Sequence, residues 1–524
     1  MRNYQVIAAE KVAQRSSKIP KDWLISPDSS KDATNLLHIP TTCGVLSDVE
    51  YNITSNYDAT ALLEKLRAGE FSAEQVTRAF CKRAAVAQQL VNCLTEIFFD
   101  EAIERARQLD AERRDSPDPS SSLPPLWGLP ISVKDSFAYQ GHDTSTGLAC
   151  YAYEPSPEHS ALAALLLDLG AVLYCKTNLP QSIMTGDSDN HLFGRTLNPR
   201  NTRLTAGGST GGEGALLALR GSVLGVGTDI GGSIRVPAVC NGIYGLRPSV
   251  GVVPHGGVRD VTVPGTVGGY VLSGSHGHVD AGCFAVPPDH HEGGDLEERL
   301  RIGLVEDDGL YTPSPPVRRG LKKAADILRG RSDVEIIPIA LPNVGQIYQD
   351  LLSYYTLTGS DYYFEQFGRT GEPLVPSLAA LTPLLASPGT TLKGFFDLNV
   401  RRAEAAKTYL SLFRDNGLDA ILMPPAPHTA VPLDTWSTIT YTGLWNYLDY
   451  PAVVIPVDQV REEDAPDDIS NAKFGAEDAR VYGLYTDPED YRDAPICIQL
   501  VGYRHQDEAL ANTAVVLDGI INGN

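Results

Sequence analysis

The chain has 524 residues, of which 42% are hydrophobic and 21% charged, the composition of a folded globular protein. Its formal net charge of −22 argues against a nucleic-acid partner, since such binding depends on Lys and Arg neutralising phosphates, and against an anionic membrane surface. No signal-peptide core and no run of about 20 apolar residues is present, so we expect a cytoplasmic protein without a membrane segment.

The first 115 residues are predicted to be mostly helical. We expect helices over 58–68, from Ser72 onward, and over 100–114. Ser72 with Gln75 three positions later forms the pattern of a capping box, which is typical of a helix start. The turn-rich stretch 116–125 then separates this helical part from a segment of different character.

Strands and helices alternate in the rest of the chain. LPISVKD (129–135) and AVLYCKTN (171–178) are expected to be strands, with a helix over 159–170 between them. Further on we expect a strand at 301–309, helices at 316–330 and 391–416, and buried strands at DAILMPPAP and YPAVVIPV. This alternation predicts an α/β fold with helices on the faces of a mainly parallel sheet.

The cysteines and histidines indicate neither a disulfide framework nor a metal centre. The eight cysteines are widely spaced and form no C-x-x-C pair, so we expect free thiols. Five residues near one another could suggest metal binding, but their spacing matches no standard ligand pattern, and we expect a solvated loop and no metal. They are His276, His278, Asp280, His290 and His291.

The glycines concentrate in the segment 206–251, which includes AGGSTGGEGALLALRGSVLGVGTDIGGSIR. Neither a P-loop nor a dinucleotide-binding pattern is present, and the G-x-S-x-G nucleophile elbow is absent as well. The segment therefore leaves Ser209 and Ser233, both in glycine-dense turns, as candidate nucleophiles. The alternative is that both serines are structural residues of turns without a catalytic role.

A serine hydroxyl needs a base to remove its proton, and no histidine lies within this segment. A lysine made neutral by burial can serve instead, because desolvation lowers the pKa of a lysine. Lys134 is embedded in the apolar strand LPISVKD. Strand alternation places Asp135 on the opposite face, so that carboxylate need not keep the lysine protonated.

These residues lie in motifs that resemble a known family. GGSTGGEGALLALRGSVLGVGTDIGGSIR resembles the signature block of the amidase signature enzymes, and GLPISVKDSF resembles the segment that carries their catalytic lysine. Ser209 follows Lys134 by 75 residues and Ser233 follows Ser209 by 24, which are the intervals of that family. The resemblance covers nearly the whole chain, and NYLDYPAVVIPV and APICIQLVGYRHQDEAL are most similar to the fungal acetamidase branch.

The resemblance implies a fold and a domain organisation. It implies a three-layer α/β/α sandwich around a large twisted mixed, mainly parallel sheet. The whole chain, 1–524, would be one domain. Within it, 1–115 would be an N-terminal helical part, 126–251 the catalytic core, and 296–524 the remaining sheet, helices and substrate pocket.

The resemblance also implies an amide hydrolase that works through an acyl-enzyme and uses no cofactor. Ser233 matches the nucleophile, Ser209 the bridging serine that follows a cis peptide bond, and Lys134 the general base. The substrate would be a small-molecule carboxamide, which releases ammonia or an amine, and a homodimer is a family-level expectation.

Other residues near the two serines receive supporting roles. Thr210 is assigned an auxiliary hydrogen-bonding role, and Asp229 and Arg235 are expected to form an ion pair that braces the nucleophile loop. Glycines let successive backbone N–H groups converge on one oxygen. The expected oxyanion hole consists of the N–H groups of Ile230, Gly231, Gly232 and Ser233.

One segment departs from the family pattern. Residues 255–295 lack the usual Gly-Pro dipeptide and look shortened, which leaves alternatives open. An acyl transferase, a specialised-metabolite amidase or esterase, the glutamine-hydrolysing subunit of an amidotransferase, and a non-catalytic binding protein all remain. The pocket walls are expected within 183–194, 351–400 and 436–450, where aromatic and aliphatic residues are frequent.

Overall fold

The computed structural model describes residues 2–31, 33–115, 123–259, 281–285, 299–357, 359 and 361–523. The divergent segment 255–295, with the five candidate metal ligands named above, therefore lies largely outside the described residues. The strands are β1 (Leu94–Ile97), β2 (Pro130–Lys134), β3 (Val172–Thr177), β4 (Leu224–Thr228), β5 (Tyr244–Arg247), β6 (Ala281–Ala285), β7 (Leu300–Leu304), β8 (Val334–Pro338), β9 (Ala420–Met423), β10 (Ala452–Gln459) and β11 (Pro495–Val501).

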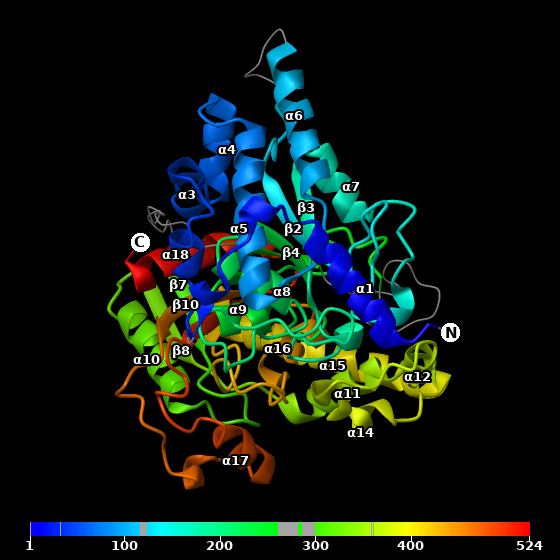
Figure 1. Ribbon diagram of the computed structural model, residues 1–524. Coiled ribbons are helices and arrows are strands. Elements are labelled where there is room, and N and C mark those ends of the chain that lie inside the picture. The colour runs from blue at the N-terminus through cyan, green and yellow to red at the C-terminus, as the bar shows by residue number, and fades with distance from the viewer. Residues whose placement is uncertain are drawn as a thin grey trace.

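The helices surround these strands (Figure 1). They are α1 (Tyr4–Ser17), α2 (Ile39–Thr42), α3 (Asp48–Ser55), α4 (Ala59–Ala68), α5 (Ala73–Val91), α6 (Phe99–Asp115), α7 (Ala161–Asp168), α8 (Gly211–Ala218), α9 (Arg235–Asn241), α10 (Pro315–Arg329), α11 (Val344–Tyr355), α12 (Asp361–Gly368), α13 (Pro376–Ala379), α14 (Thr382–Leu385), α15 (Leu392–Asn416), α16 (Thr440–Leu448), α17 (Ala476–Tyr482) and α18 (Asp507–Asn522). Each element expected from the sequence is present, but β7 and β9 are about half as long as the strands expected there, because they end at Leu304 and Met423. The capping box of Ser72 and Gln75 begins α5.

All the strands form one sheet, in the order β1-β3-β2-β4-β6-β5-β10-β11-β9-β7-β8. The sheet is mixed, as expected. The expectation that it is mainly parallel is wrong, because only β2 with β3 and β4, and β7 with β8 and β9, pair in parallel. The other six pairings between described strands are antiparallel. Short strands buried on both faces are apolar in either direction, so their sequences do not encode their orientation.

The alternation of side chains along β10 places helices on both faces of the sheet. Val453, Ile455 and Val457 pack in one cluster with α10 and α18. Ala452 packs with α11 and α16, and Val454 packs with α9. Successive side chains of a strand point to opposite faces, so the sheet is the middle layer of an α/β/α sandwich.

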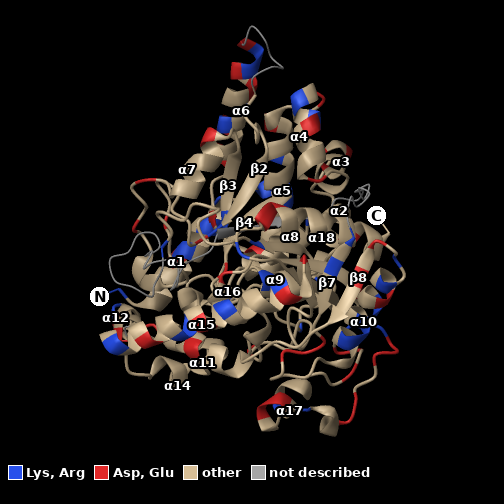
Figure 2. Cartoon of the chain, turned by 180° about the vertical axis from the view of Figure 1, so that it is seen from behind, with Lys and Arg blue, Asp and Glu red and all other residues tan. Residues whose placement is uncertain are grey.

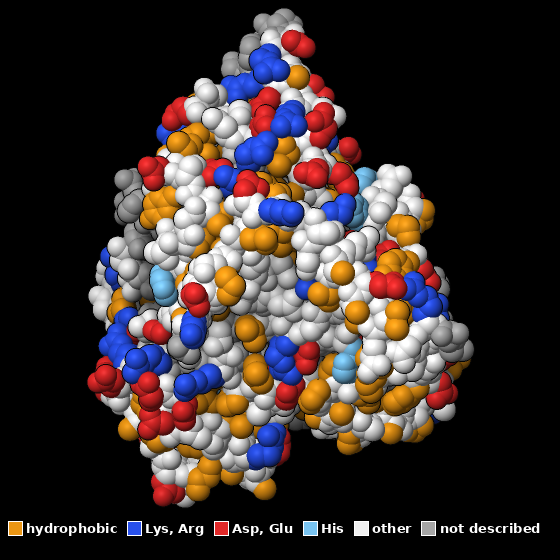
Figure 3. Space-filling view, viewed as in Figure 1, with side chains coloured by type: hydrophobic (Ala, Val, Ile, Leu, Met, Phe, Trp, Pro, Cys, Tyr) orange, Lys and Arg blue, Asp and Glu red, His pale blue; other side chains and the backbone are white. Residues whose placement is uncertain are grey.

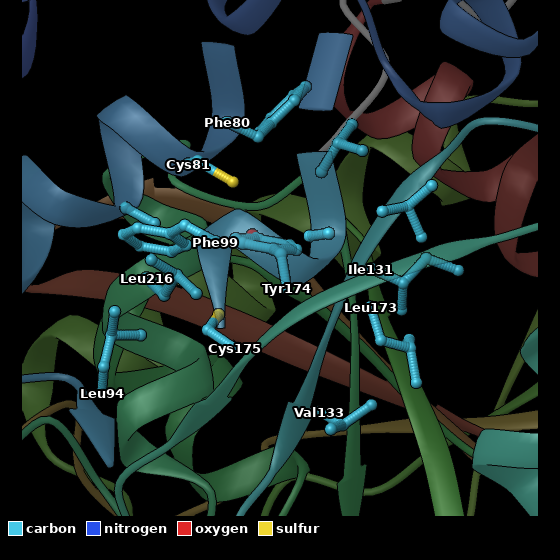
Figure 4. Packing of buried hydrophobic residues seen from close by; sticks show 14 of the residues in the cluster. Phe80, Cys81, Leu94, Phe99, Ile131, Val133, Leu173, Tyr174, Cys175 and Leu216 are labelled. Carbon is cyan, nitrogen blue, oxygen red and sulfur yellow. The ribbon is translucent and has the colours of Figure 1, made fainter. Parts of the chain in front are cut away.

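A second core region joins the first half of the chain to the same sheet. Phe80 of α5, Phe99 of α6 and Leu216 of α8 belong to one buried cluster with Ile131 of β2 and Tyr174 of β3 (Figure 4). The N-terminal helices therefore hold β2 and β3 in a tightly packed environment. This matters for function because β2 ends at Lys134.

Charge lies on the outer elements. Lys, Arg, Asp and Glu occur mainly on helices such as α4, α6, α10 and α17, whereas the strands carry few of them (Figure 2). On the face shown in Figure 3, basic and acidic side chains are interspersed. The seven cysteines with described side chains are free thiols, as expected, and no helix in the described ranges is long and apolar enough to cross a bilayer.

The packing of α10 on the sheet yields a stability prediction. A Cβ on Gly320 would lie 2.3 Å from Ile496 Cγ2 of β11, so Gly320→Ala must push the helix away from the sheet. We expect a loss of about 1–3 kcal/mol of stability, seen as a lower melting temperature. The control is Gly368→Ala in α12, where a Cβ would meet no atom within 4 Å. Equal melting temperatures for the two variants would contradict this account of the packing.

Candidate active site

Lys134 ends β2 between β3 and β4 and is fully buried. Its Nζ lies 2.7 Å from Ser209 Oγ, 2.9 Å from Thr210 Oγ1 and 2.7 Å from Thr228 Oγ1. Burial disfavours a charged amine. The N-terminus of α8, which follows Thr210, is the positive end of a helix dipole and disfavours a second positive charge beside it.

The hydroxyls beside this amine differ in the hydrogen bonds that they can accept. The Thr210 hydroxyl donates to the carbonyl oxygen of Thr228 over 3.3 Å, so Thr210 Oγ1 can accept a hydrogen bond from Nζ. An uncharged amine has two N–H groups and one lone pair. An uncharged Nζ that donates to Thr210 and Thr228 would keep its lone pair for Ser209, whereas a charged Nζ donates to all three hydroxyls. Sequence analysis did not identify Thr228 as part of the site, although this residue ends the strand β4.

Ser209 sits in a tightly packed turn. The peptide bond between Gly208 and Ser209 is cis, as the resemblance implied. A Cβ on Gly208 would lie 2.3 Å from the carbonyl oxygen of Thr185, so only glycine fits there. Ser188 holds the turn on both sides, because its hydroxyl donates to Gly207 O and accepts from Gly211 N.

Ser233 lines a small cavity of about 60 Å³. The three segments expected to form the pocket walls all contribute to it, with Met184, Tyr355 and Ile439 among the lining side chains. The full lining consists of Ile183, Met184, Thr185, Gly186, Gly208, Ile230, Gly231, Gly232, Ser233, Val236, Tyr355 and Ile439. The arrangement places Ser233 at the wall of a mostly apolar pocket.

The loop before Ser233 is braced by an ion pair. The Asp229 carboxylate accepts from Arg235 Nε and Nη2, each at 3.0 Å, and both side chains are fully buried. Burial raises the pKa of Asp229, but the Arg235 guanidinium outweighs burial and holds that pKa well below its usual range. The Asp229 carboxylate thus stays charged at neutral pH.

One member of the expected oxyanion group behaves differently. The Gly232 N–H donates to Asp229 Oδ1 over 2.7 Å, because the carboxylate folds back over the residue three positions ahead of it. The N–H groups of Ile230, Gly231 and Ser233 have no acceptor among the described residues. These three remain available to bind an oxygen in the cavity.

A buried acid lies next to Lys134. Glu213 of α8 is fully buried and accepts from Thr177 Oγ1 over 2.7 Å, and Ser132 Oγ is its second partner. Burial raises the pKa of Glu213 to about 7, although both hydroxyls lower it, as a positive charge on Lys134 would. Sequence analysis did not identify Glu213 as part of the site. The signal that could have found it is its position in GGEGAL, at a glycine-rich helix start.

A larger cavity, of about 460 Å³, lies away from these serines beneath α1. Its lining includes Lys11, which pairs with Glu96 and with Asp143. This cavity contains no member of the predicted site. In the described ranges, no three His, Cys, Asp or Glu side chains are grouped as metal ligands.

The comparisons with known proteins agree with this geometry. The family model described as Amidase matches residues 75–272 and 276–511. The chain is 36% identical to a Schizosaccharomyces pombe protein named as an amidase, over 99% of both chains. It is 34% identical to an acetamidase of Emericella nidulans, over 97% of this chain and 96% of that one.

A solved structure, that of a fatty acid amide hydrolase, aligns with a TM-score of 0.85 and 28% identity over 98% of this chain and 95% of that chain. The family match spans most of the chain, the sheet is covered on both faces, and the relatives are amide hydrolases. The chain therefore belongs to the amidase signature family and is an enzyme that hydrolyses carbon–nitrogen bonds of amides.

Proposed function

We propose that this chain hydrolyses small carboxamides through an acyl-enzyme on Ser233, with Ser209 and Lys134 as the proton relay. The observation that carries the proposal is the buried Lys134 Nζ at 2.7 Å from Ser209 Oγ. The two residues are 75 positions apart in the sequence, and the fold brings them together in its interior. The cytoplasmic location and the homodimer stay predictions.

The proposed reaction begins with a neutral Lys134. It takes the Ser209 proton as Ser209 takes that of Ser233, and Ser233 Oγ attacks the amide carbonyl. The N–H groups of Ile230, Gly231 and Ser233 stabilise the resulting oxyanion. The amine leaves with a proton returned through Ser209, and water then cleaves the ester on Ser233.

The cavity size supports a small substrate. One water molecule needs about 10–15 Å³ of such a cavity, so about 60 Å³ accommodates roughly four to six non-hydrogen atoms. Acetamide has four. The apolar side chains of Met184, Val236 and Ile439 in the lining suit a short aliphatic acyl group rather than a charged one.

The first test removes the proposed nucleophile and base. We expect Ser233→Ala and Lys134→Met to lower kcat/KM for acetamide on the order of 10⁴-fold, because the relay acts as a unit. Ser233→Ala should also abolish labelling by a fluorophosphonate. The control is Ser136→Ala, whose buried hydroxyl has no hydrogen-bond partner in the described part of the chain, and which should keep full activity.

Full activity of Ser233→Ala would show that another group attacks the amide. Full activity of Lys134→Met with an inactive Ser233→Ala would leave the nucleophile in place and overturn the proton relay. Melting temperatures of each variant separate a chemical defect from unfolding.

The hydrogen-bond chain around Glu213 predicts a pH effect on stability. Ser222 Oγ donates to Leu224 O over 2.9 Å, and Ser132 Oγ lies 2.8 Å from Ser222 Oγ. Every hydrogen in this chain has an acceptor when Glu213 is protonated and donates to Ser132. The other titratable groups near Glu213 are Lys134, Cys93, Cys175 and Tyr174.

The Glu213 pKa of about 7 lies above the ordinary value of 4.5. Between these values the folded chain holds a proton that the unfolded chain releases, so Glu213 lowers stability as pH rises from about 4.5 to about 7. Glu213→Gln keeps the hydrogen-bond pattern without titrating. We expect it to gain on the order of 1–3 kcal/mol over the wild type between pH 5 and pH 8, measured as melting temperature against pH. A constant difference across this range would contradict a raised pKa.

Ile439 provides a test of the acyl pocket. Ile439→Ala should raise kcat/KM for hexanamide relative to acetamide roughly tenfold to a hundredfold, because about 0.8 kcal/mol is gained per buried methylene. The matched control is Ile439→Leu, which keeps the side-chain volume and should keep the wild-type preference. An unchanged ratio in Ile439→Ala would mean that the acyl group binds elsewhere.

A further inference from the structure

We infer that Tyr355 and Thr442 are positioning residues, which hydrogen-bond carbonyl groups of the loop 229–233 and thereby orient its N–H groups. The Tyr355 hydroxyl donates to Ile230 O over 2.5 Å, and the Thr442 hydroxyl donates to Gly231 O over 2.6 Å. This inference rests on the proposed function, since Tyr355 orients the Gly231 N–H, which is assigned to the oxyanion.

Every carbonyl oxygen of this loop has a donor. Besides the two hydroxyls, Asn446 Nδ2 donates to Asp229 O over 2.9 Å. Two backbone N–H groups complete the set, that of Val236 to Gly232 O over 2.6 Å and that of Thr210 to Ser233 O over 3.2 Å. Five consecutive carbonyls are thus held from outside the loop, three of them by side chains of α11 and α16.

Because the peptide unit is planar, a contact that fixes the C=O group of one residue also fixes the N–H group of the next residue. In a trans peptide, the C=O of one residue and the N–H of the next point in opposite directions. Tyr355, by holding Ile230 O, therefore orients the Gly231 N–H, which has no acceptor among the described residues. Thr442, by holding Gly231 O, orients the Gly232 N–H toward Asp229.

The same two hydroxyls press against the glycines. A Cβ on Gly231 would lie 2.6 Å from Tyr355 Oη, and a Cβ on Gly232 would lie 2.4 Å from Thr442 Oγ1. Gly232 also has a φ of +132°, a conformation that side-chain-bearing residues rarely adopt. The two hydroxyls thus occupy space that a Cβ at either position would take, so packing explains the need for glycine at both positions.

The hydroxyls are presented by packed helices. Tyr355 is the last residue of α11, and Thr442 lies in the first turn of α16. A Cβ on Gly443 of α16 would lie 2.6 Å from Leu351 Cδ2 of α11, so the two helices are in close contact. They also share one buried cluster. The helices can therefore hold both hydroxyls in fixed positions.

The experiment compares Tyr355→Phe with Tyr354→Phe. The Tyr354 hydroxyl donates to Asn399 Oδ1 of α15, not to the loop, so this neighbour is the matched control. Losing one oxyanion donor costs about 10²–10³ in rate. Tyr355→Phe keeps the donor but frees its peptide unit, so we expect kcat for acetamide to fall about tenfold to a hundredfold, with KM within about twofold.

Binding of a short alkyl boronic acid, which forms a tetrahedral adduct on a nucleophilic serine, should weaken by a similar factor in Tyr355→Phe, since that adduct mimics the transition state. Thr442→Val frees the Gly231–Gly232 peptide unit, whose N–H donates to Asp229 and not to the oxyanion, so kcat should fall less than in Tyr355→Phe. Thr442→Ser, which keeps the hydroxyl, should restore it. Tyr354→Phe should match the wild type in all three measurements.

Two results would overturn the positioning role. One is a Tyr355→Phe enzyme whose kcat is unchanged or whose defect lies only in KM, which would make Tyr355 a simple pocket wall. The other is a Thr442→Ser enzyme as impaired as Thr442→Val. An active Ser233→Ala enzyme would instead overturn the proposed function itself. Failure of the positioning role and failure of the proposed function are therefore distinguishable.

Discussion

The burial of one amine among three hydroxyls is the constraint on which the site depends. The hydroxyl oxygens of Ser209, Thr210 and Thr228 lie 2.7–2.9 Å from Lys134 Nζ, and a neutral hydroxyl favours a charged amine less than a carboxylate does. The neighbouring carboxylate, that of Asp135, pairs with Lys176 at 3.1 Å on the other side of the strand. A fold that keeps water away from Lys134 must pack β2 on both faces, and the N-terminal helices and α8 supply that packing.

Much of this site could be predicted from local sequence. Lys134, Ser209 and Ser233 lie in motifs whose residue types and spacing are fixed, and the structure brings Lys134 and Ser209 into contact. Asp229 and Arg235 are close in sequence, so their ion pair was also readable. The three wall segments could be named because aromatic and aliphatic residues gather there, and each contributes to the cavity.

Other features of the fold and the site could not be predicted from the sequence, for physical reasons. The bond from Tyr355 to Ile230 spans 125 residues, and no periodicity or motif marks a single hydroxyl as the partner of a distant carbonyl. The direction of strands such as β5 and β11 depends on their neighbours in the sheet and not on their own apolar residues. The Gly232 N–H is different, because an aspartate three positions earlier is a local signal for a side-chain bond to the backbone.

The narrowness of the cavity beside Ser233 bears on the second half of the reaction. In the proposed acyl-enzyme, the acyl group stays on Ser233 while the amine departs, so the attacking water must enter the space that the amine has left. Ammonia and water are nearly equal in size, and the exchange of one for the other needs no rearrangement of a pocket of about 60 Å³. A bulky departing amine would have to pass the same walls first. Under the proposed mechanism, primary amides are therefore the substrates for which departure and water entry are best matched.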